Sequence, residues 1–247
     1  GGVAGLVMRI VLSQGCDAGQ RGGQAMAGWR RFAVYYTPEG GLARWGAAWL
    51  GWDPVAGREV PQPRVPGLDL AAATAAPRRY GFHATMKAPF RPAEGVTPTA
   101  LAAALARFCA GEPPVALAGG LIPARLGGFV ALVPARDSEA LTALESRLVE
   151  ALDRCRASPT ADEIARRVPE RLTPAERENL RRWGYPWVRE LFRFHMTLSD
   201  SLDTAQTDRI LAALRLQLPP LPDPFPIDAL SLMGEDASGR VHLIRRL

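Results

Sequence analysis

The feature that most constrains the fold of this 247-residue chain is a tetrapeptide, Phe-His-x-Thr, that occurs twice. The two copies lie at residues 82–85 and 194–197, and an apolar residue follows each of them. Because side chains alternate between the two faces of an extended strand, each histidine and the threonine two residues later point the same way. The repeat therefore predicts two similar strands whose four polar side chains line one cleft.

We call His83 and Thr85 the first His–Thr pair, and His195 and Thr197 the second. Two imidazole–hydroxyl pairs that face each other can hold an anion between an acid and a base. A single histidine on an apolar strand is more often a hydrogen-bonded core residue. Here, however, two of the three histidines stand in the same frame, which favours a functional interpretation. The third, His242, lies outside any such motif and is interpreted as structural.

Composition indicates a globular chain with enough residues for one core or for two small lobes packed together. The formal net charge of +5 favours anionic partners such as phosphates, although a basic surface is often merely solvated. The three cysteines show no Cys-x-x-Cys spacing, so we expect neither a disulfide framework nor a zinc site. Cysteine usage of this kind is typical of the reducing cytoplasm.

Residues 1–28 are interpreted as a disordered leader rich in Gly, Gln and Ala. Their apolar stretch is interrupted by Arg9 and is too short to span a bilayer, and it lacks the basic start of a signal peptide. The folded part is expected to begin near Met26 or Trp29 and to form a single domain of two lobes over residues 29–247. We expect a monomer without membrane contact.

A β-branched and aromatic run at residues 31–37 predicts the first strand. If Phe32 and Val34 face the core, Tyr35 points the other way and becomes a candidate for the cleft wall; a half-buried structural tyrosine is the alternative. Residues 53–79 read as a long loop, typical of a rim or lid over a site. The other elements we expect are helices over 38–52, 97–110, 138–156, 162–167, 173–183 and 204–217, and strands over 115–122, 129–134, 227–233 and 241–246.

The first histidine strand is expected over residues 80–87 and is ended by Pro89, and the second is expected over residues 191–199. Alternation places Lys87 with the first His–Thr pair and Arg193 with the second. The planar donors of Arg193 suit a phosphate. For Lys87, a phosphate contact and a solvated strand end both stay open.

A helical insertion is expected over residues 158–190, just ahead of the second histidine strand. It holds a capping box that starts at Thr173, a helix that ends near Trp183, and a turn that contains Tyr185. Its arginines and aromatic residues suit a flap over an anionic substrate, with Tyr185 as a candidate contact. A helical hairpin that simply covers one lobe is the alternative.

The order of elements repeats in the two halves of the chain, which predicts an α+β fold of two lobes. We expect antiparallel sheets that line a central cleft, helices on the outer faces, and a pseudo-two-fold axis that relates the lobes. Each lobe then gives one His–Thr pair to the cleft.

At these residues the chain resembles the two-histidine (2H) phosphoesterase superfamily, whose mark is a pair of H-x-[ST]-hydrophobic motifs on duplicated lobes. The resemblance spans residues 31–247, and two departures are Met86 in place of the commoner Leu and Ser199-Asp200 in place of a hydroxyl residue followed by Gly. Its bacterial branch is usually named for phosphonate metabolism and has no assigned activity. The strings that resemble this branch are Tyr-Gly-Phe-His-Ala-Thr at 80–85, Trp-Gly-Tyr-Pro at 183–186 and Phe-Arg-Phe-His-Met-Thr-Leu at 192–198.

The resemblance implies that His83 and His195 are an acid–base pair and that Thr85 and Thr197 bind phosphate oxygens. It implies a hydrolase that opens a cyclic phosphodiester, such as a 2′,3′-cyclic nucleotide or a ribose cyclic phosphate, without a metal or another cofactor. Ring opening needs one group to deprotonate water and another to protonate the leaving oxygen, which two imidazoles can supply. The sequence leaves open which histidine is the base.

Three other functions stay open at this point. RNA end processing or 2′-5′ RNA chemistry would make RNA the partner, but no basic aromatic platform for single strands stands out, which favours a small phosphate ester. A protein that binds a nucleotide or an RNA end without turnover could use the same cleft. A metal hydrolase is disfavoured, because two histidines with no nearby carboxylate pattern seldom complete a metal site.

Overall fold

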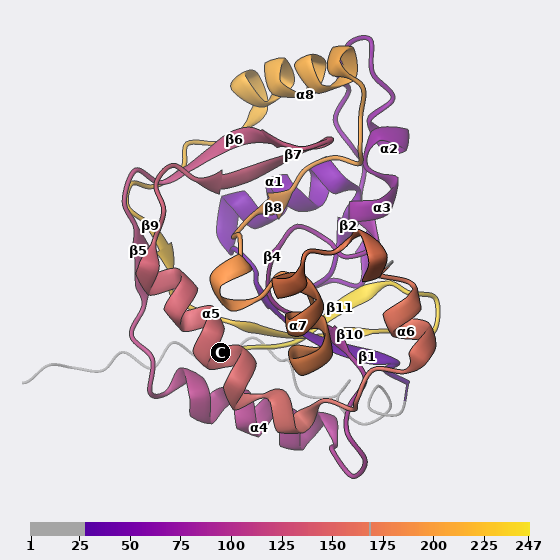
Figure 1. The fold of residues 1–247 in the computed structure, drawn as a ribbon. Helices are drawn as coiled ribbons and strands as arrows, with labels where there is room; N and C mark the ends of the chain where they lie inside the picture. The colour runs from indigo at the N-terminus through magenta and orange to yellow at the C-terminus, as the bar shows by residue number, and fades with distance from the viewer. Residues whose placement is uncertain (1–27, 168) are drawn as a thin grey trace, which may run out of the picture.

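The computed structural model describes residues 28–167 and 169–247, so the expected disordered leader lies outside the described residues except for Gly28. One seven-stranded sheet forms the centre of a mixed α/β fold (Figure 1). Its strands are β1 (Arg31–Tyr36), β4 (Ala84–Phe90), β6 (Leu121–Leu126), β7 (Phe129–Pro134), β8 (Met196–Thr197), β10 (Ser231–Glu235) and β11 (Val241–Arg246). They lie in the order β11-β10-β1-β4-β8-β7-β6, and all neighbours are antiparallel.

Two short antiparallel ribbons and a set of helices complete the fold. The ribbons pair β2 (Trp52–Asp53) with β3 (Arg58–Glu59), and β5 (Val115–Leu117) with β9 (Phe225–Ile227). The helices are α1 (Gly40–Leu50), α2 (Leu70–Ala73), α3 (Ala75–Arg78), α4 (Pro98–Cys109), α5 (Glu139–Ala151), α6 (Ala161–Ala165), α7 (Pro174–Trp183) and α8 (Thr204–Gln217). Short 3-10 turns lie at Asp153–Cys155, Pro169–Arg171 and Arg189–Leu191. Among the described residues, no helix has both the length and the apolar character needed to cross a bilayer.

The apolar residues of the two histidine motifs pack against α1. The Trp49 indole donates a hydrogen bond to the Leu198 carbonyl at 2.9 Å. Gly46 has no room for a side chain, because an added Cβ would lie 2.0 Å from the Phe82 ring. This close contact buries Phe82, and Phe194 is buried as well, so both motif phenylalanines belong to the main core.

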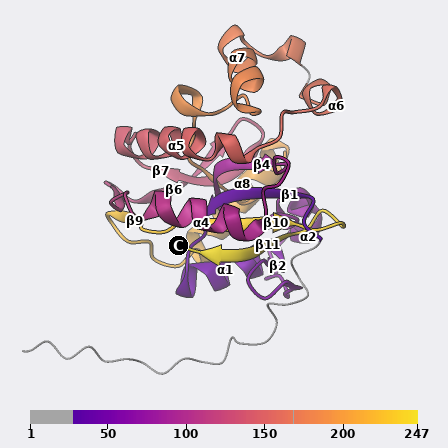
Figure 2. The ribbon, with the colours of Figure 1, turned by 90° about the horizontal axis from the view of Figure 1, so that it is seen from below.

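The two views of the ribbon place α1 and the α6–α7 insertion on opposite sides of the sheet (Figures 1 and 2). Both helices of the insertion begin with a capping box, at Thr160 and at Thr173, and the second confirms the predicted start of α7. The His–Thr pairs alternate with the buried residues that face α1, so they point toward the side that carries the insertion.

The predicted bounds of both histidine strands were wrong. The first strand begins at Ala84 and continues through Pro89 to Phe90. On its β8 side, β4 pairs only at Ala84, so the missing N–H of Pro89 breaks no ladder bond there. The second strand covers only Met196–Thr197, because the chain leaves the insertion through a 3-10 turn and the Arg193 carbonyl accepts a bond from the His195 ring.

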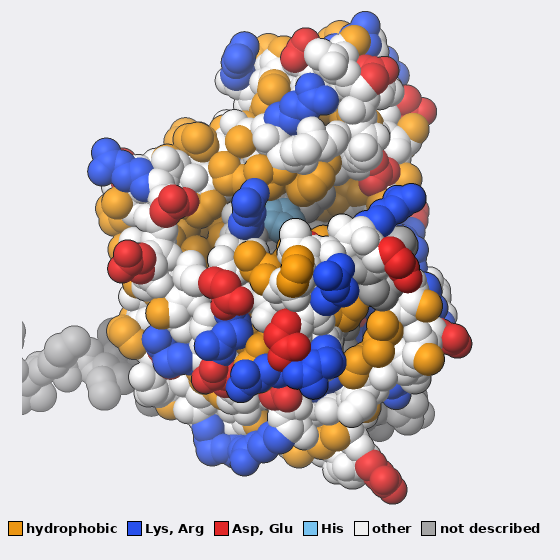
Figure 3. All heavy atoms as spheres, viewed as in Figure 1, with side chains coloured by type: hydrophobic (Ala, Val, Ile, Leu, Met, Phe, Trp, Pro, Cys, Tyr) orange, Lys and Arg blue, Asp and Glu red, His pale blue; other side chains and the backbone are white. Residues whose placement is uncertain are grey.

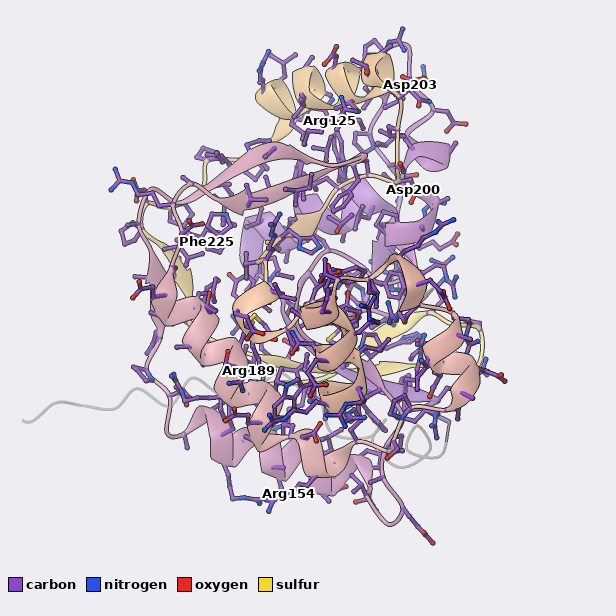
Figure 4. All side chains as sticks on the ribbon, viewed as in Figure 1. Arg125, Arg154, Arg189, Asp200, Asp203 and Phe225 are labelled. Atoms are coloured by element: carbon purple, nitrogen blue, oxygen red, sulfur yellow. The ribbon has the colours of Figure 1, made fainter. Side chains whose placement is uncertain are left out.

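The segment after β8 is anchored by Asp200, which lies beside α3 (Figure 4). Its carboxylate accepts the Ala76 amide at 3.1 Å, and its own amide donates to the Ala73 carbonyl at 2.7 Å. Asp200 stands where the family resemblance predicts a glycine. Its two hydrogen bonds connect the end of the second histidine motif to the α2–α3 turn.

The expected combination of helices and antiparallel strands is present. The two histidine motifs lie in adjacent central positions of one seven-stranded sheet, where separate sheets of two lobes were expected. Duplication of two lobes about a pseudo-two-fold axis stays a prediction.

Candidate active site

The two His–Thr pairs meet because β4 and β8 are antiparallel neighbours in the sheet. Ala84 pairs with Met196, and one step along this register in either direction sets His83 opposite Thr197 and Thr85 opposite His195. All four side chains are half-buried, whereas Phe82, Ala84, Phe194 and Met196 between them are buried. A histidine is visible at the base of a hollow in the surface, among apolar and basic side chains (Figure 3).

The two imidazoles are held by the same hydrogen bond. His83 Nδ1 lies 2.8 Å from the Gly81 carbonyl, and His195 Nδ1 lies 2.7 Å from the Arg193 carbonyl. A carbonyl can only accept, so Nδ1 carries the proton in both rings and Nε2 is left as the group that can exchange one. Gly81 has a φ of 74°, which favours glycine and turns its carbonyl back toward the ring.

His83 lies against two tyrosines. The Tyr35 ring stacks on the imidazole with ring centroids 3.7 Å apart, and the Tyr80 ring lies 6.4 Å away. Nε2 is 3.1 Å from the Thr85 hydroxyl. Burial lowers the pKa of His83 to about 4, the charge of nearby His195 adds to this, and the bond to Gly81 opposes it. The ring is therefore neutral at pH 7, with Nε2 as an acceptor.

The second pair is bounded by small and aromatic residues of β7. The Phe129 ring lies 5.7 Å from the His195 ring, and Thr197 pairs with Ala131. Within the described part of the chain, the Thr197 hydroxyl makes no hydrogen bond to protein. It is therefore available to an anion that lies over this face of the sheet.

Tyr35 lies beneath the imidazole and not at the surface of the hollow. Its side chain is 1% exposed, and burial raises the pKa of its phenol far above the usual range. Tyr35 can position His83, but it is too deeply buried to contact a substrate.

Lys87 is not brought to the His–Thr pairs. Its ammonium group is buried and donates to the Val149 carbonyl of α5 at 3.1 Å, and burial lowers its pKa to about 8. Along β4, Ala84, Met86 and Phe90 belong to the main core, so Lys87 lies on the same face of the strand as Thr85. Its ammonium group is bound by α5 instead of pointing to the His–Thr pairs.

Arg193 and Tyr185 lie on the insertion side of the site. The Arg193 side chain is exposed, and its carbonyl orients His195. Tyr185 follows the left-handed Gly184 at the end of α7, and the Arg167 guanidinium lies over its ring at 4.8 Å. Burial raises the pKa of the Tyr185 phenol, and Arg167 opposes this rise.

The sequence patterns predict no role for Tyr80, Phe129 or Arg167. Tyr80 and Phe129 flank the imidazoles from the loop before β4 and from the start of β7. No periodicity marks residues at such boundaries, although Tyr80 belongs to the string that carries the family resemblance. Within residues 28–167 and 169–247, no three His, Cys, Asp or Glu side chains are grouped so that they could hold a metal ion.

The site lies within a region that matches a family model. The model described as "Protein of unknown function (DUF1045)" matches residues 85–242, more than half of the chain. This range contains Thr85 and the whole second His–Thr pair; His83 falls two residues before it.

Two curated bacterial proteins are similar to most of the chain, and both are named ribose 1,5-bisphosphate phosphokinase PhnN. The protein from Janthinobacterium sp. (strain Marseille) is 36% identical over 219 residues, which cover 85% of this chain and 48% of that protein. The protein from Laribacter hongkongensis (strain HLHK9) is 34% identical, with 88% and 51% covered. The chain thus spans about half the length of these relatives.

A solved structure described as "Crystal structure of phosphoesterase" aligns with 89% of this chain and 97% of its own. The sequence identity is 14% and the TM-score is 0.41.

Proposed function

This chain belongs to the DUF1045 family of proteins of unknown function, and we propose that it is a metal-independent phosphodiesterase that opens a cyclic phosphodiester by two-histidine acid–base catalysis. One observation carries the proposal. Two imidazoles, each directly before one of two adjacent strands, are fixed through Nδ1 by the same kind of hydrogen bond, and each has a threonine hydroxyl two residues later. The arrangement matches the needs of a reaction in which one group accepts a proton while another donates one.

In this proposal His83 is the base, because burial against Tyr35 keeps its imidazole neutral at pH 7. As the water oxygen bonds to phosphorus, its proton passes to His83 Nε2. The bond from phosphorus to one ring oxygen breaks, and His195 in its protonated form gives the Nε2 proton to that oxygen. The product is a phosphomonoester and an alcohol, and the two rings return to their starting protonation states by exchange with solvent.

The threonine hydroxyls bind the phosphoryl oxygens in this proposal. In the free protein, Thr85 bonds His83 Nε2 and turns to the phosphate when substrate enters. Thr197 has its hydroxyl free for the opposite side of the phosphate. Such donors stabilise the charge that grows on the oxygens in the transition state. Arg193, exposed beside the second pair, adds a positive charge at the mouth of the hollow.

We propose a ribose cyclic phosphate as the substrate. The relatives are named for a kinase that acts on ribose 1,5-bisphosphate, a compound with a phosphate on ribose carbon 1. When a 1,2-cyclic phosphate of ribose is hydrolysed by breaking the bond between phosphorus and the carbon 2 oxygen, the phosphate stays on carbon 1 and carbon 2 carries a hydroxyl. The relatives' name therefore supports a ribose phosphate over an RNA end. The proposed link to phosphonate metabolism comes from the resemblance of the sequence strings to the bacterial branch.

The matching hydrogen bonds also support the proposed duplication. In each motif the imidazole bonds the carbonyl two residues before it, and the two motifs run in opposite directions on adjacent strands. Antiparallel neighbours related in this way are what a pseudo-two-fold axis through the Ala84–Met196 pair would produce.

The test is a turnover assay in the presence of a chelator, with products identified by phosphorus NMR. The substrates are ribose 1,2-cyclic phosphate, adenosine 2′,3′-cyclic phosphate and an oligoribonucleotide that ends in a 2′,3′-cyclic phosphate. We expect hydrolysis of the first, and none by the His83→Ala/His195→Ala double variant. Preference for the oligonucleotide would assign RNA end processing instead. Binding of these compounds without turnover would make the chain a binding protein, and activity abolished by the chelator would contradict metal independence.

A further inference from the structure

A basic cavity of about 720 Å³ has in its lining Tyr80, the residue whose ring flanks His83. It is enclosed by the start of β1, the loop before β4, the end of β4 and the α6–α7 insertion. Seven arginines and three acidic residues line it, so its net charge is positive. The volume lies within the range of sites that hold small molecules.

The cavity approaches His83 through a shared residue. Tyr80 lines the cavity, and its ring is 6.4 Å from the imidazole. A molecule whose reacting group sits at the His–Thr pairs can therefore extend into this cavity.

Only some of the cavity's arginines are neutralised. Arg31 pairs with Glu235, Arg91 with Glu163, and Arg156 with Asp153. Across the described residues, the other arginines of the cavity make no ion pair: Arg30, Arg79, Arg166 and Arg167. Of these, the Arg79 guanidinium lies against Gly239 in the turn between β10 and β11, and the Arg167 guanidinium lies over the ring of Tyr185. These two place unneutralised positive charge in the lining of the cavity.

We propose that this cavity binds a second phosphate group of the substrate, with Arg79 and Arg167 as ligands. The substrate is then a sugar cyclic phosphate that also carries a phosphomonoester, and the cyclic phosphate alone is a poorer substrate. Guanidinium groups bind phosphate oxygens through paired, charge-assisted hydrogen bonds, which suits this assignment. The inference rests on the proposed function for the position of the reacting group, and on the cavity for the second group.

The first test compares ribose 1,2-cyclic phosphate with the same compound phosphorylated on carbon 5. We expect kcat/KM to be higher for the phosphorylated compound by about 10- to 100-fold, the effect of one or two charged hydrogen bonds. Arg79→Gln and Arg167→Gln should each lower this preference by about tenfold. Arg107→Gln is the matched control, because Arg107 is exposed on α4 and outside the cavity, and it should leave the preference unchanged.

The second test is binding, which needs no turnover. Calorimetric titration should show that the wild-type chain binds ribose 5-phosphate more tightly than ribose, and that Arg79→Gln and Arg167→Gln weaken this binding while Arg107→Gln does not. If neither cyclic compound is hydrolysed but ribose 5-phosphate binds in this way, the proposed function fails and the phosphate site stands. If both compounds turn over with equal kcat/KM, or the cavity variants bind ribose 5-phosphate like the wild type, the phosphate site is wrong.

Discussion

The ring of Tyr35 lies under the imidazole of His83, with an angle of 20° between the ring planes and 3.7 Å between the ring centroids. Burial of this kind disfavours the charged imidazolium, and it is the main cause of the lowered His83 pKa. A tyrosine that no substrate can reach thus sets the protonation state of a residue that we assign as the base.

Tyr35→Leu should raise the His83 pKa, because a smaller side chain admits water to the imidazole. In the wild type, kcat/KM should fall as pH drops through about 4, where His83 takes up a proton and can no longer act as a base. The leucine variant should lose activity at a higher pH, closer to the ordinary value of 6.5. Tyr35→Phe keeps the stacked ring and should keep the wild-type profile. An acidic limb at the same pH in all three proteins would contradict the role of Tyr35.

Thr197→Val should lower kcat about 10- to 100-fold, because it removes a hydroxyl that donates to the phosphoryl oxygens while it keeps the shape of the side chain. Thr85→Val should act in the same direction. The serine variants retain the hydroxyl and serve as matched controls. Steady-state kinetics on the cyclic phosphate measures the effect, and valine variants as active as the serine variants would exclude a direct role for the hydroxyls.

Glu145→Gln should change how stability depends on pH. Glu145 is buried on α5 and accepts the Arg189 amide at 2.9 Å, and burial raises its pKa from 4.5 to about 7. The folded chain therefore holds a proton that the unfolded chain has lost between pH 4.5 and 7. Stability from this group is complete below pH 4.5 and is lost as pH rises through 7.

Relative to the glutamine variant, the wild-type free energy of unfolding should fall by on the order of 2–3 kcal/mol from pH 5 to pH 7.5. Urea denaturation at both pH values measures the difference between the two proteins, so the contribution of other titrating groups such as His83 cancels. A difference that does not vary with pH would mean that Glu145 titrates normally.

Asp200→Ala should lower the free energy of unfolding by about 1 kcal/mol, the usual effect of losing a side-chain acceptor at the start of a helix. The carboxylate accepts the Ala76 amide of α3, and that amide would be left without this partner. Asp200→Asn keeps an acceptor oxygen and should lose less. Thermal or urea denaturation of the three proteins measures these differences in stability. An alanine variant as stable as the wild type would contradict a stabilising role for the Asp200 carboxylate at the start of α3.

Local patterns were sufficient to predict much of this fold. The helix expected over 204–217 is α8 with the same bounds, and the helix expected over 173–183 differs from α7 by one residue, because caps and apolar spacing are properties of adjacent residues. Alternation along the strands also predicted correctly that Tyr35 points away from the main core. Such signals need no knowledge of distant contacts.

The long-range features could not be obtained in this way. Nothing local indicates that β4 and β8 are neighbours, or that the Val149 carbonyl of α5 accepts a hydrogen bond from the Lys87 ammonium group. The basic cavity is lined by side chains from separate segments of the chain, so no spacing in the sequence indicates that it exists.

The hydrolysis rate of ribose 1,2-cyclic phosphate by the single variants His83→Ala and His195→Ala tests the central claim most directly. We predict that each variant loses at least about 100-fold in kcat, as expected for removal of a general acid or base. His242→Gln, which changes the histidine outside the site and keeps a donor to Asp236, should retain the wild-type rate. Wild-type turnover in either the His83 or the His195 variant would contradict a site built from two histidines.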